Sequence, residues 1–146
     1  MDAISCLPGY ETWTGEANGA YCQSYLENED GIVTWVSLPA HRWPKEWIGK
    51  YENPVVILVL ALYGHPKAGK IWEGDCTQRV KKCGWIELSE SWPNVFRQPK
   101  IKAFLLIYVD DFKLVAKSKH QKGLWEKSKG VIDTRGKILG MQVLQF

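Results

Sequence analysis

Histidine and cysteine are scarce in this sequence. There are three histidines and four cysteines, and no two cysteines form a Cys-x-x-Cys pair. The histidines are also far from any metal-ligand spacing. The pattern therefore gives no sign of a zinc site, and a reducing compartment is the simplest assumption for the free thiols.

Long apolar segments are also missing. The longest apolar run is residues 55–62, whereas a helix needs about 20 residues to cross a bilayer. The N-terminal Met-Asp-Ala lacks the basic start and apolar core of a signal peptide. We therefore expect a soluble protein.

Neither sign of charge is in large excess. The chain has 19 basic and 16 acidic residues, with 45% hydrophobic and 24% charged residues among its 146, as in an ordinary globular domain. The lysines are nevertheless uneven, because residues 113–129 contain only one acid. This run predicts either a solvated helix face or contact with a nucleic-acid backbone. Its lysines are Lys113, Lys117, Lys119, Lys122, Lys127 and Lys129.

The hydrophobic pattern predicts an α+β fold, with helices on one face of an antiparallel sheet. Residues 1–15 are turn-rich and are expected to be a loop or a truncated lead-in, so the domain is expected to span residues 16–146. Helices are expected at 17–26, 67–83 and 124–132. Strands are expected at 34–38, 55–60, 93–96, 103–108, 112–116 and 138–144, with the strand at 55–60 buried.

Asp110 and Asp111 follow a strongly apolar strand. Adjacent carboxylates repel each other, and Asp is a poor strand former. A hairpin tip relieves both problems if the charges meet water or a cation. The residues therefore fit either a magnesium site, since Mg²⁺ prefers carboxylate oxygens, or an ordinary Asp-containing turn.

Four segments resemble boxes of copia-type reverse transcriptases. Tyr-Val-Asp-Asp at residues 108–111 is similar to the Tyr-x-Asp-Asp box. Leu-Tyr-Gly-His-Pro-Lys-Ala-Gly-Lys-Ile-Trp at 62–72 resembles Leu-Tyr-Gly-Leu-Lys-Gln-Ala-x-Arg-x-Trp. Leu-Gly-Met-Gln-Val at 139–143 resembles the family's strand that supports the primer end. Trp-Val-Ser-Leu-Pro at 35–39 resembles a strand of the family that ends in Pro and is followed by a loop.

The resemblance implies a polymerase palm that uses two Mg²⁺ ions, an RNA or DNA template-primer and a deoxynucleoside triphosphate. Metal ligation and catalysis would fall to Asp110 and Glu16, with Asp111 assisting. The residues that would contact substrate are Tyr108, Gly64, Lys67, Lys70 and Tyr21. Contacts with nucleic acid would come from Lys113, Lys117, Lys119 and Gly140.

The sequence departs from the family pattern at several of these positions. Glu16 stands where the family's Asp-x-x-x-Ala-[Phe/Tyr] box has Asp, so the carboxylate reaches one methylene further. Lys67 replaces Gln, and Lys70 replaces Arg, which loses bidentate phosphate geometry. Finger strands, thumb and ribonuclease H domains would have to come from elsewhere in a polyprotein.

Two functions therefore remain open. The chain is either a reverse-transcriptase palm or a catalytically inactive retroelement remnant, which is inert or binds nucleic acid. An unrelated α+β protein with an incidental Asp-Asp turn would instead place Glu16 far from Asp110. The expected location is the cytoplasm, an intracellular particle or the nucleus.

Overall fold

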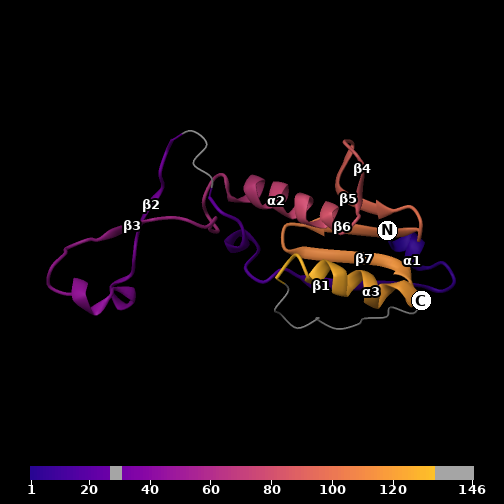
Figure 1. Cartoon of the computed structure of the whole chain (residues 1–146), viewed down its shortest axis with the longest axis horizontal. Coiled ribbons are helices and arrows are strands. Elements are labelled where there is room, and N and C mark those ends of the chain that lie inside the picture. The colour runs from indigo at the N-terminus through magenta and orange to yellow at the C-terminus, as the bar shows by residue number, and fades with distance from the viewer. Residues whose placement is uncertain (27–30, 134–146) are drawn as a thin grey trace.

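The computed structural model describes residues 1–26 and 31–133, which form a mixed α+β fold around a five-stranded antiparallel sheet. Strand order is β1-β7-β6-β5-β4, and β2 and β3 form a separate ribbon that extends away from the sheet (Figure 1). The main-sheet strands are β1 (Tyr10–Glu16), β4 (Ile86–Ser89), β5 (Trp92–Gln98), β6 (Ala103–Tyr108) and β7 (Asp111–Lys117). The ribbon is β2 (Trp35–Ser37) and β3 (Val55–Ile57), and the α-helices are α1 (Asp2–Ser5), α2 (Ala68–Lys82) and α3 (Ser118–Lys129).

One face of the sheet carries the core. Side chains alternate along β6 and β7, so every second residue faces α2 and α3. These helices contribute Trp72, Val80, Leu124 and Trp125 to one continuous hydrophobic cluster. The sheet residues in it include Leu105, Ile107, Phe112 and Leu114. The predicted antiparallel sheet with two helices on one face is confirmed.

The sequence did not predict α1, which contacts β1 and β7. Lys113 alternates with core residues on β7 and so points to the opposite face of the sheet. Its ammonium group pairs there with the carboxylate of Asp2 in α1. A short helix therefore covers part of the face that α2 and α3 leave open.

The prediction of a loop or truncated lead-in for residues 1–15 was wrong for residues 10–15, which form a strand. Those residues belong to β1, which pairs with β7 along its whole length, from Tyr10 opposite Lys117 to Glu16 opposite Asp111. Thr and Trp, which favour strands, alternate within β1. The neighbouring turn residues Pro8 and Gly9 hid this signal.

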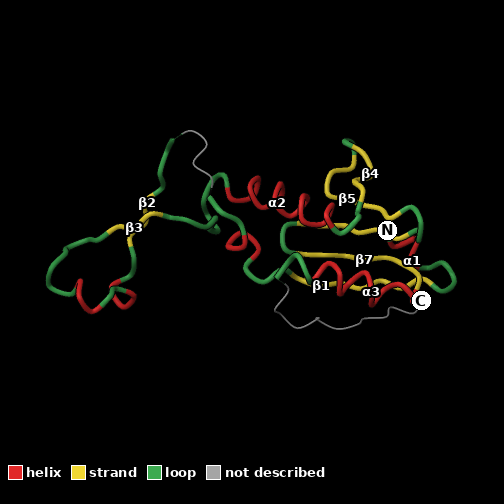
Figure 2. The backbone as a smooth tube through the Cα atoms, viewed as in Figure 1, coloured by secondary structure: helices red, strands yellow, loops and turns green. Residues whose placement is uncertain are grey.

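The buried strand expected at residues 55–60 is shorter and more exposed than predicted. Only Val55–Ile57 forms a strand, and Val55 and Ile57 remain 49% and 47% exposed. Among the described residues, β3 pairs only with β2 in this two-stranded sheet. Figure 2 shows the ribbon extending away from the main sheet and the α-helices. Continuous hydrophobicity was therefore a poor guide to burial here.

The remaining element predictions had mixed outcomes. Helices at 67–83 and 124–132 match α2 and α3 approximately, while the helix expected at 17–26 is a single 3-10 turn, η1 (Ala20–Gln23). The other 3-10 turns are η2 (Ala40–Arg42) and η3 (Lys45–Trp47). Strand β4 was not predicted, and the strand expected at 138–144 lies outside the described residues. None of the described helices is long and apolar enough to cross a membrane.

Candidate carboxylate site at the β6–β7 turn

The β6–β7 hairpin closes through a strained two-residue turn. Tyr108 pairs with Asp111, so Val109 and Asp110 occupy the two central positions. Val109 has a φ of 55°, a left-handed conformation that glycine adopts freely and that is an outlier for a β-branched residue. Such strain costs on the order of 1–3 kcal/mol and tends to persist at functional sites.

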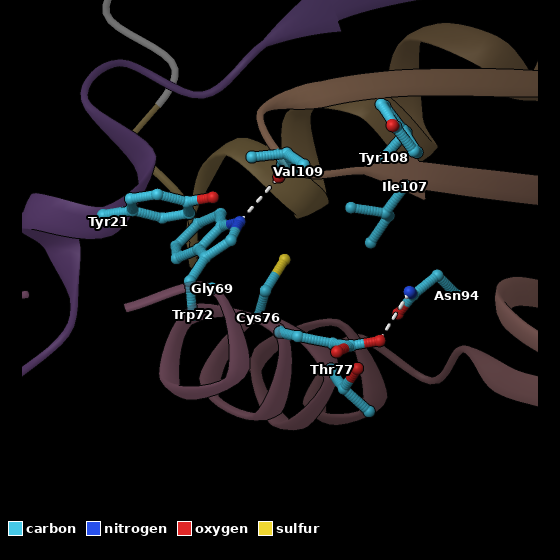
Figure 3. Close-up of a pocket in the computed structure, with 10 residues that line it drawn as sticks. Tyr21, Gly69, Trp72, Cys76, Thr77, Asn94, Ile107, Tyr108 and Val109 are labelled. Carbon is cyan, nitrogen blue, oxygen red and sulfur yellow. Dashed lines mark hydrogen bonds between the residues drawn. The ribbon is translucent and has the colours of Figure 1, made fainter. Parts of the chain in front are cut away.

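Trp72 holds this turn in place from α2. Its indole N–H donates a 2.6 Å hydrogen bond to the carbonyl oxygen of Val109, and the side chain is only 2% exposed. Figure 3 shows the indole reaching from the helix to the turn. A buried side chain of α2 therefore fixes the conformation of the β6–β7 turn, although β4 and β5 lie between α2 and β6 in the sequence.

Glu16 lies beside the turn rather than across the sheet from it. It is the cross-strand partner of Asp111, and the N–H of the next residue, Ala17, donates a 2.7 Å hydrogen bond to the carbonyl oxygen of Asp110. Directly opposed residues on antiparallel strands share a face. Glu16 and Asp111 therefore lie side by side at the edge of the hairpin.

This shared face is the one opposite α2 and α3. The adjacent pair, Gly15 and Phe112, faces the helices, because Gly15 packs under the ring of Trp125. Glu16 and Asp111 must then point the other way. Tyr108 pairs with Asp111 on the same face and is 74% exposed. The row formed by Glu16, Asp111 and Tyr108 is accessible to a ligand.

Tyr63 links Glu16 and Asp110 electrostatically. Burial, followed by the nearby carboxylate of Asp110, raises the pKa of the Tyr63 phenol, and Glu16 adds a smaller effect in the same direction. The ring of Tyr63 also stacks on Tyr21 at a centroid distance of 4.3 Å. Tyr21 was predicted as a substrate-binding residue, whereas Tyr63 was missed although it lies within the Leu-Tyr-Gly motif.

The three carboxylates do not form a closed ligand cage. Within residues 1–26 and 31–133, no three His, Cys, Asp or Glu side chains lie close enough together to hold a metal ion. Mg²⁺ is usually held by only one or two protein carboxylates and completes its shell with water and substrate phosphates. The donor set of Glu16, Asp110 and Asp111 fits that open type of site.

A polar network fixes η1, which carries Tyr21, to α2. Arg79 donates hydrogen bonds of 3.0 and 2.6 Å to the Asp75 carboxylate and one of 2.6 Å to the carbonyl oxygen of Gln23. Ser24 donates a 2.7 Å bond to the same carboxylate. Burial opposes the charge on Asp75, but the hydrogen bonds from Arg79 and Ser24 outweigh it and lower the pKa of the carboxyl.

The Leu-Tyr-Gly segment leads from the ribbon into α2. Gly64 has a φ of 94°, a conformation that disfavours other residues. Lys67 is the N-cap residue of α2, and Lys70 is exposed in its first turn. Both lysines therefore lie on the surface at the start of the helix whose Trp72 supports the hairpin.

The predicted nucleic-acid lysines do not cluster around the carboxylates. Lys113 is near Asp111 but is paired with Asp2. Lys117 ends β7 and Lys119 is the second residue of α3, so both lie roughly 20 Å from the turn at about 3.3 Å per strand residue. Gly140 lies outside the described residues.

A cavity of about 220 Å³ lies on the helix side of the hairpin. Figure 3 shows its walls, which come from η1, α2, β5, β6 and the turn. The cavity was not predicted from the sequence, because its residues come together only through packing. It is lined by Tyr21, Gly69, Trp72, Glu73, Cys76, Thr77, Asn94, Ile107, Tyr108 and Val109.

Comparison with known proteins adds nothing to this geometry. No protein-family model, no curated protein and no solved structure matches the chain.

Proposed function

We propose that this chain is the palm-like core of a copia-type reverse transcriptase. It would catalyse Mg²⁺-dependent transfer of a nucleotide to a primer 3′-hydroxyl on an RNA or DNA template. The observation that carries the proposal is the pairing of Glu16 with Asp111 beside the turn that contains Asp110. The strained Val109 and the family-like boxes support it further.

The chain's own residues have distinct roles in this proposal. Asp110 and Glu16 would hold the metal, and Asp111 would add negative charge beside them. When bound, a pair of Mg²⁺ ions supplies the charge that activates an attacking hydroxyl and stabilises a leaving pyrophosphate. Tyr108 would face the primer from the same side of the sheet.

Tyr63 and Tyr21 would border the nucleotide. The Tyr63 phenol is protonated at neutral pH and can donate a hydrogen bond, because its ordinary pKa of 10.0 is well above 7 and its surroundings raise it further. Its stacking on Tyr21 joins η1 to the Leu-Tyr-Gly segment next to the carboxylates. Lys67 and Lys70, at the exposed start of α2, would interact with phosphates as point charges.

Primer extension tests this function. Purified full-length chain should extend a template-primer in Mg²⁺, and Asp110→Asn should abolish extension while preserving template-primer binding. Glu90→Gln, at an exposed position on the β4–β5 turn, is the matched control and should extend normally. Extension that survives in Asp110→Asn would contradict the proposed role of the carboxylate.

A second candidate is a nucleic-acid-binding remnant without catalysis. It is favoured by Glu16 in place of the family's Asp and by the absence of a three-ligand group among the described residues. Because a displacement of ~1 Å can cost about 100-fold in rate, Glu16→Asp separates the two candidates. Extension that appears only in Glu16→Asp identifies a decayed enzyme, while binding without extension in either form identifies a binding module.

A further inference from the structure

The cavity beside the hairpin is large enough for a planar ring. One wall is a stripe on α2 at helical spacing, formed by Gly69, Trp72, Glu73, Cys76 and Thr77. The volume of about 220 Å³ exceeds the roughly 150 Å³ of an engineered cavity that holds benzene. One ring or two fused rings therefore fit.

The polar groups of the cavity favour a ligand that carries N–H donors. Glu73 is the only charged residue in its lining, and its carboxylate accepts hydrogen bonds but cannot donate them. Asn94 donates a 2.7 Å bond to one Glu73 oxygen, and both residues line the cavity. A phosphate would be repelled there, while an amino group would be attracted.

The other walls suit an aromatic ligand. Tyr21 supplies aromatic surface and Val109, which is 37% exposed, supplies aliphatic surface, whereas Trp72 and Ile107 are buried and present little surface to a ligand. Figure 3 shows the Cys76 thiol directed from α2 toward the strand. Bases stack on aromatic side chains irrespective of sequence, and Glu and Asn are common partners of the amino groups of cytosine and adenine.

We propose that this cavity binds a single unstacked nucleobase that carries an exocyclic amino group, which adenine, cytosine and guanine have and uracil lacks. The base comes either from a free nucleoside or from a single-stranded nucleic acid. The inference deepens the proposed function, because it names a base-binding site beside the proposed catalytic turn. The site is nevertheless separate from the carboxylates, since Glu16 and Asp111 lie on the other face of the sheet.

Two glycines on α2 offer a matched pair of variants. A Cβ added at Gly69 lies 3.7 Å from the Tyr21 hydroxyl, an ordinary contact, and a longer side chain there enters the cavity. A Cβ added at Gly74 on the same helix meets nothing within 4 Å. Gly69→Leu should therefore fill the cavity, whereas Gly74→Leu makes the same substitution outside it.

The test is an NMR titration of the full chain in Mg²⁺-free buffer with adenosine, cytidine, uridine, indole and ribose 5-phosphate. Adenosine and cytidine should shift the signals of Ile107 and Thr77. Gly69→Leu should lose this binding, and Gly74→Leu should keep it. Equal binding by Gly69→Leu and Gly74→Leu, or equal binding of indole and adenosine, would overturn the proposal.

The amino-group preference is tested at Glu73. A hydrogen bond to a charged group is worth roughly tenfold or more in affinity, so uridine should bind at least about tenfold more weakly than cytidine. Glu73→Gln should reduce that ratio, while Glu87→Gln on β4 should not. An unchanged ratio in Glu73→Gln would overturn the assigned role of this carboxylate.

Binding measurements distinguish a free nucleoside from a nucleic-acid strand as the source of the base. Together with primer extension, they also distinguish the base-binding proposal from the proposed polymerase activity. A short oligonucleotide that binds more tightly than its nucleoside, with loss in Gly69→Leu, identifies a strand as the source. Equal affinity of the two identifies a free nucleoside. Base binding without primer extension would support the base-binding cavity and contradict the proposed polymerase activity. Primer extension without base binding would support the polymerase activity and contradict the base-binding cavity.

Discussion

Gly15 and Trp125 are packed so closely that a Cβ atom on Gly15 would lie 2.3 Å from the indole ring. Trp125 belongs to the buried face of α3, and Gly15 directly precedes Glu16 on β1. The absence of a side chain at residue 15 therefore lets β1 lie against the helix and sets the position of Glu16 beside Asp111.

Gly15→Ala should consequently destabilise the fold. Overpacking a core contact typically costs about 1–3 kcal/mol, and the loss can be measured by urea denaturation. Gly74→Ala is the control, because its Cβ meets open space and Ala is the better helix former by about 1 kcal/mol. Equal stability of Gly15→Ala and the wild type would mean that the Trp125 contact does not position β1.

Trp72→Phe should loosen the β6–β7 turn. The substitution keeps a ring in the core but leaves the Val109 carbonyl oxygen without its 2.6 Å donor. Because Val109 is 37% exposed and water can replace the donor, the lost hydrogen bond should cost only about 0.5–1.5 kcal/mol. Faster amide hydrogen exchange at Asp110 and Asp111 should accompany the lower stability. Unchanged exchange at the turn would show that the indole does not hold Val109 in its left-handed conformation.

Asp75→Asn should make the free energy of unfolding less dependent on pH in the acidic range. The folded-state pKa of Asp75 is lowered from the ordinary value of 3.8, so its contribution to stability is present above that value. It is lost as the pH falls through the lower folded-state pKa. Urea midpoints between pH 5 and pH 2 should therefore fall less steeply in Asp75→Asn than in Glu90→Gln, and parallel curves would contradict this role.

Local sequence patterns predicted those elements whose structure depends mainly on residues that are close in sequence. The stripe of Trp72, Cys76 and Val80 specified the buried face of α2, and the apolar strand followed by Asp110 and Asp111 specified the hairpin. Both signals depend on residues close in sequence. The position of Asp110 and Asp111 at the hairpin was predicted from the same local motif.

Features built by distant pairing were not predictable in this way. Strand β1 exists because it pairs with β7, roughly a hundred residues later in the chain. The hydrogen bond from Trp72 to Val109 and the stacking of Tyr63 on Tyr21 require the packed fold. The exposure of β3 likewise depends on what covers the ribbon, which hydrophobicity alone does not specify.

The most direct test of the account is whether one divalent ion contacts both chain segments at the turn. Mn²⁺ titration should broaden the backbone NMR signals of Ala17 and Asp111 together, before those of Glu87 on the far strand β4. Asp110→Asn should weaken the broadening at both positions, because Asp110 and Glu16 are proposed to hold the same ion, with Asp111 beside them. Broadening at Asp111 without Ala17, or equal broadening at Glu87, would contradict the shared site.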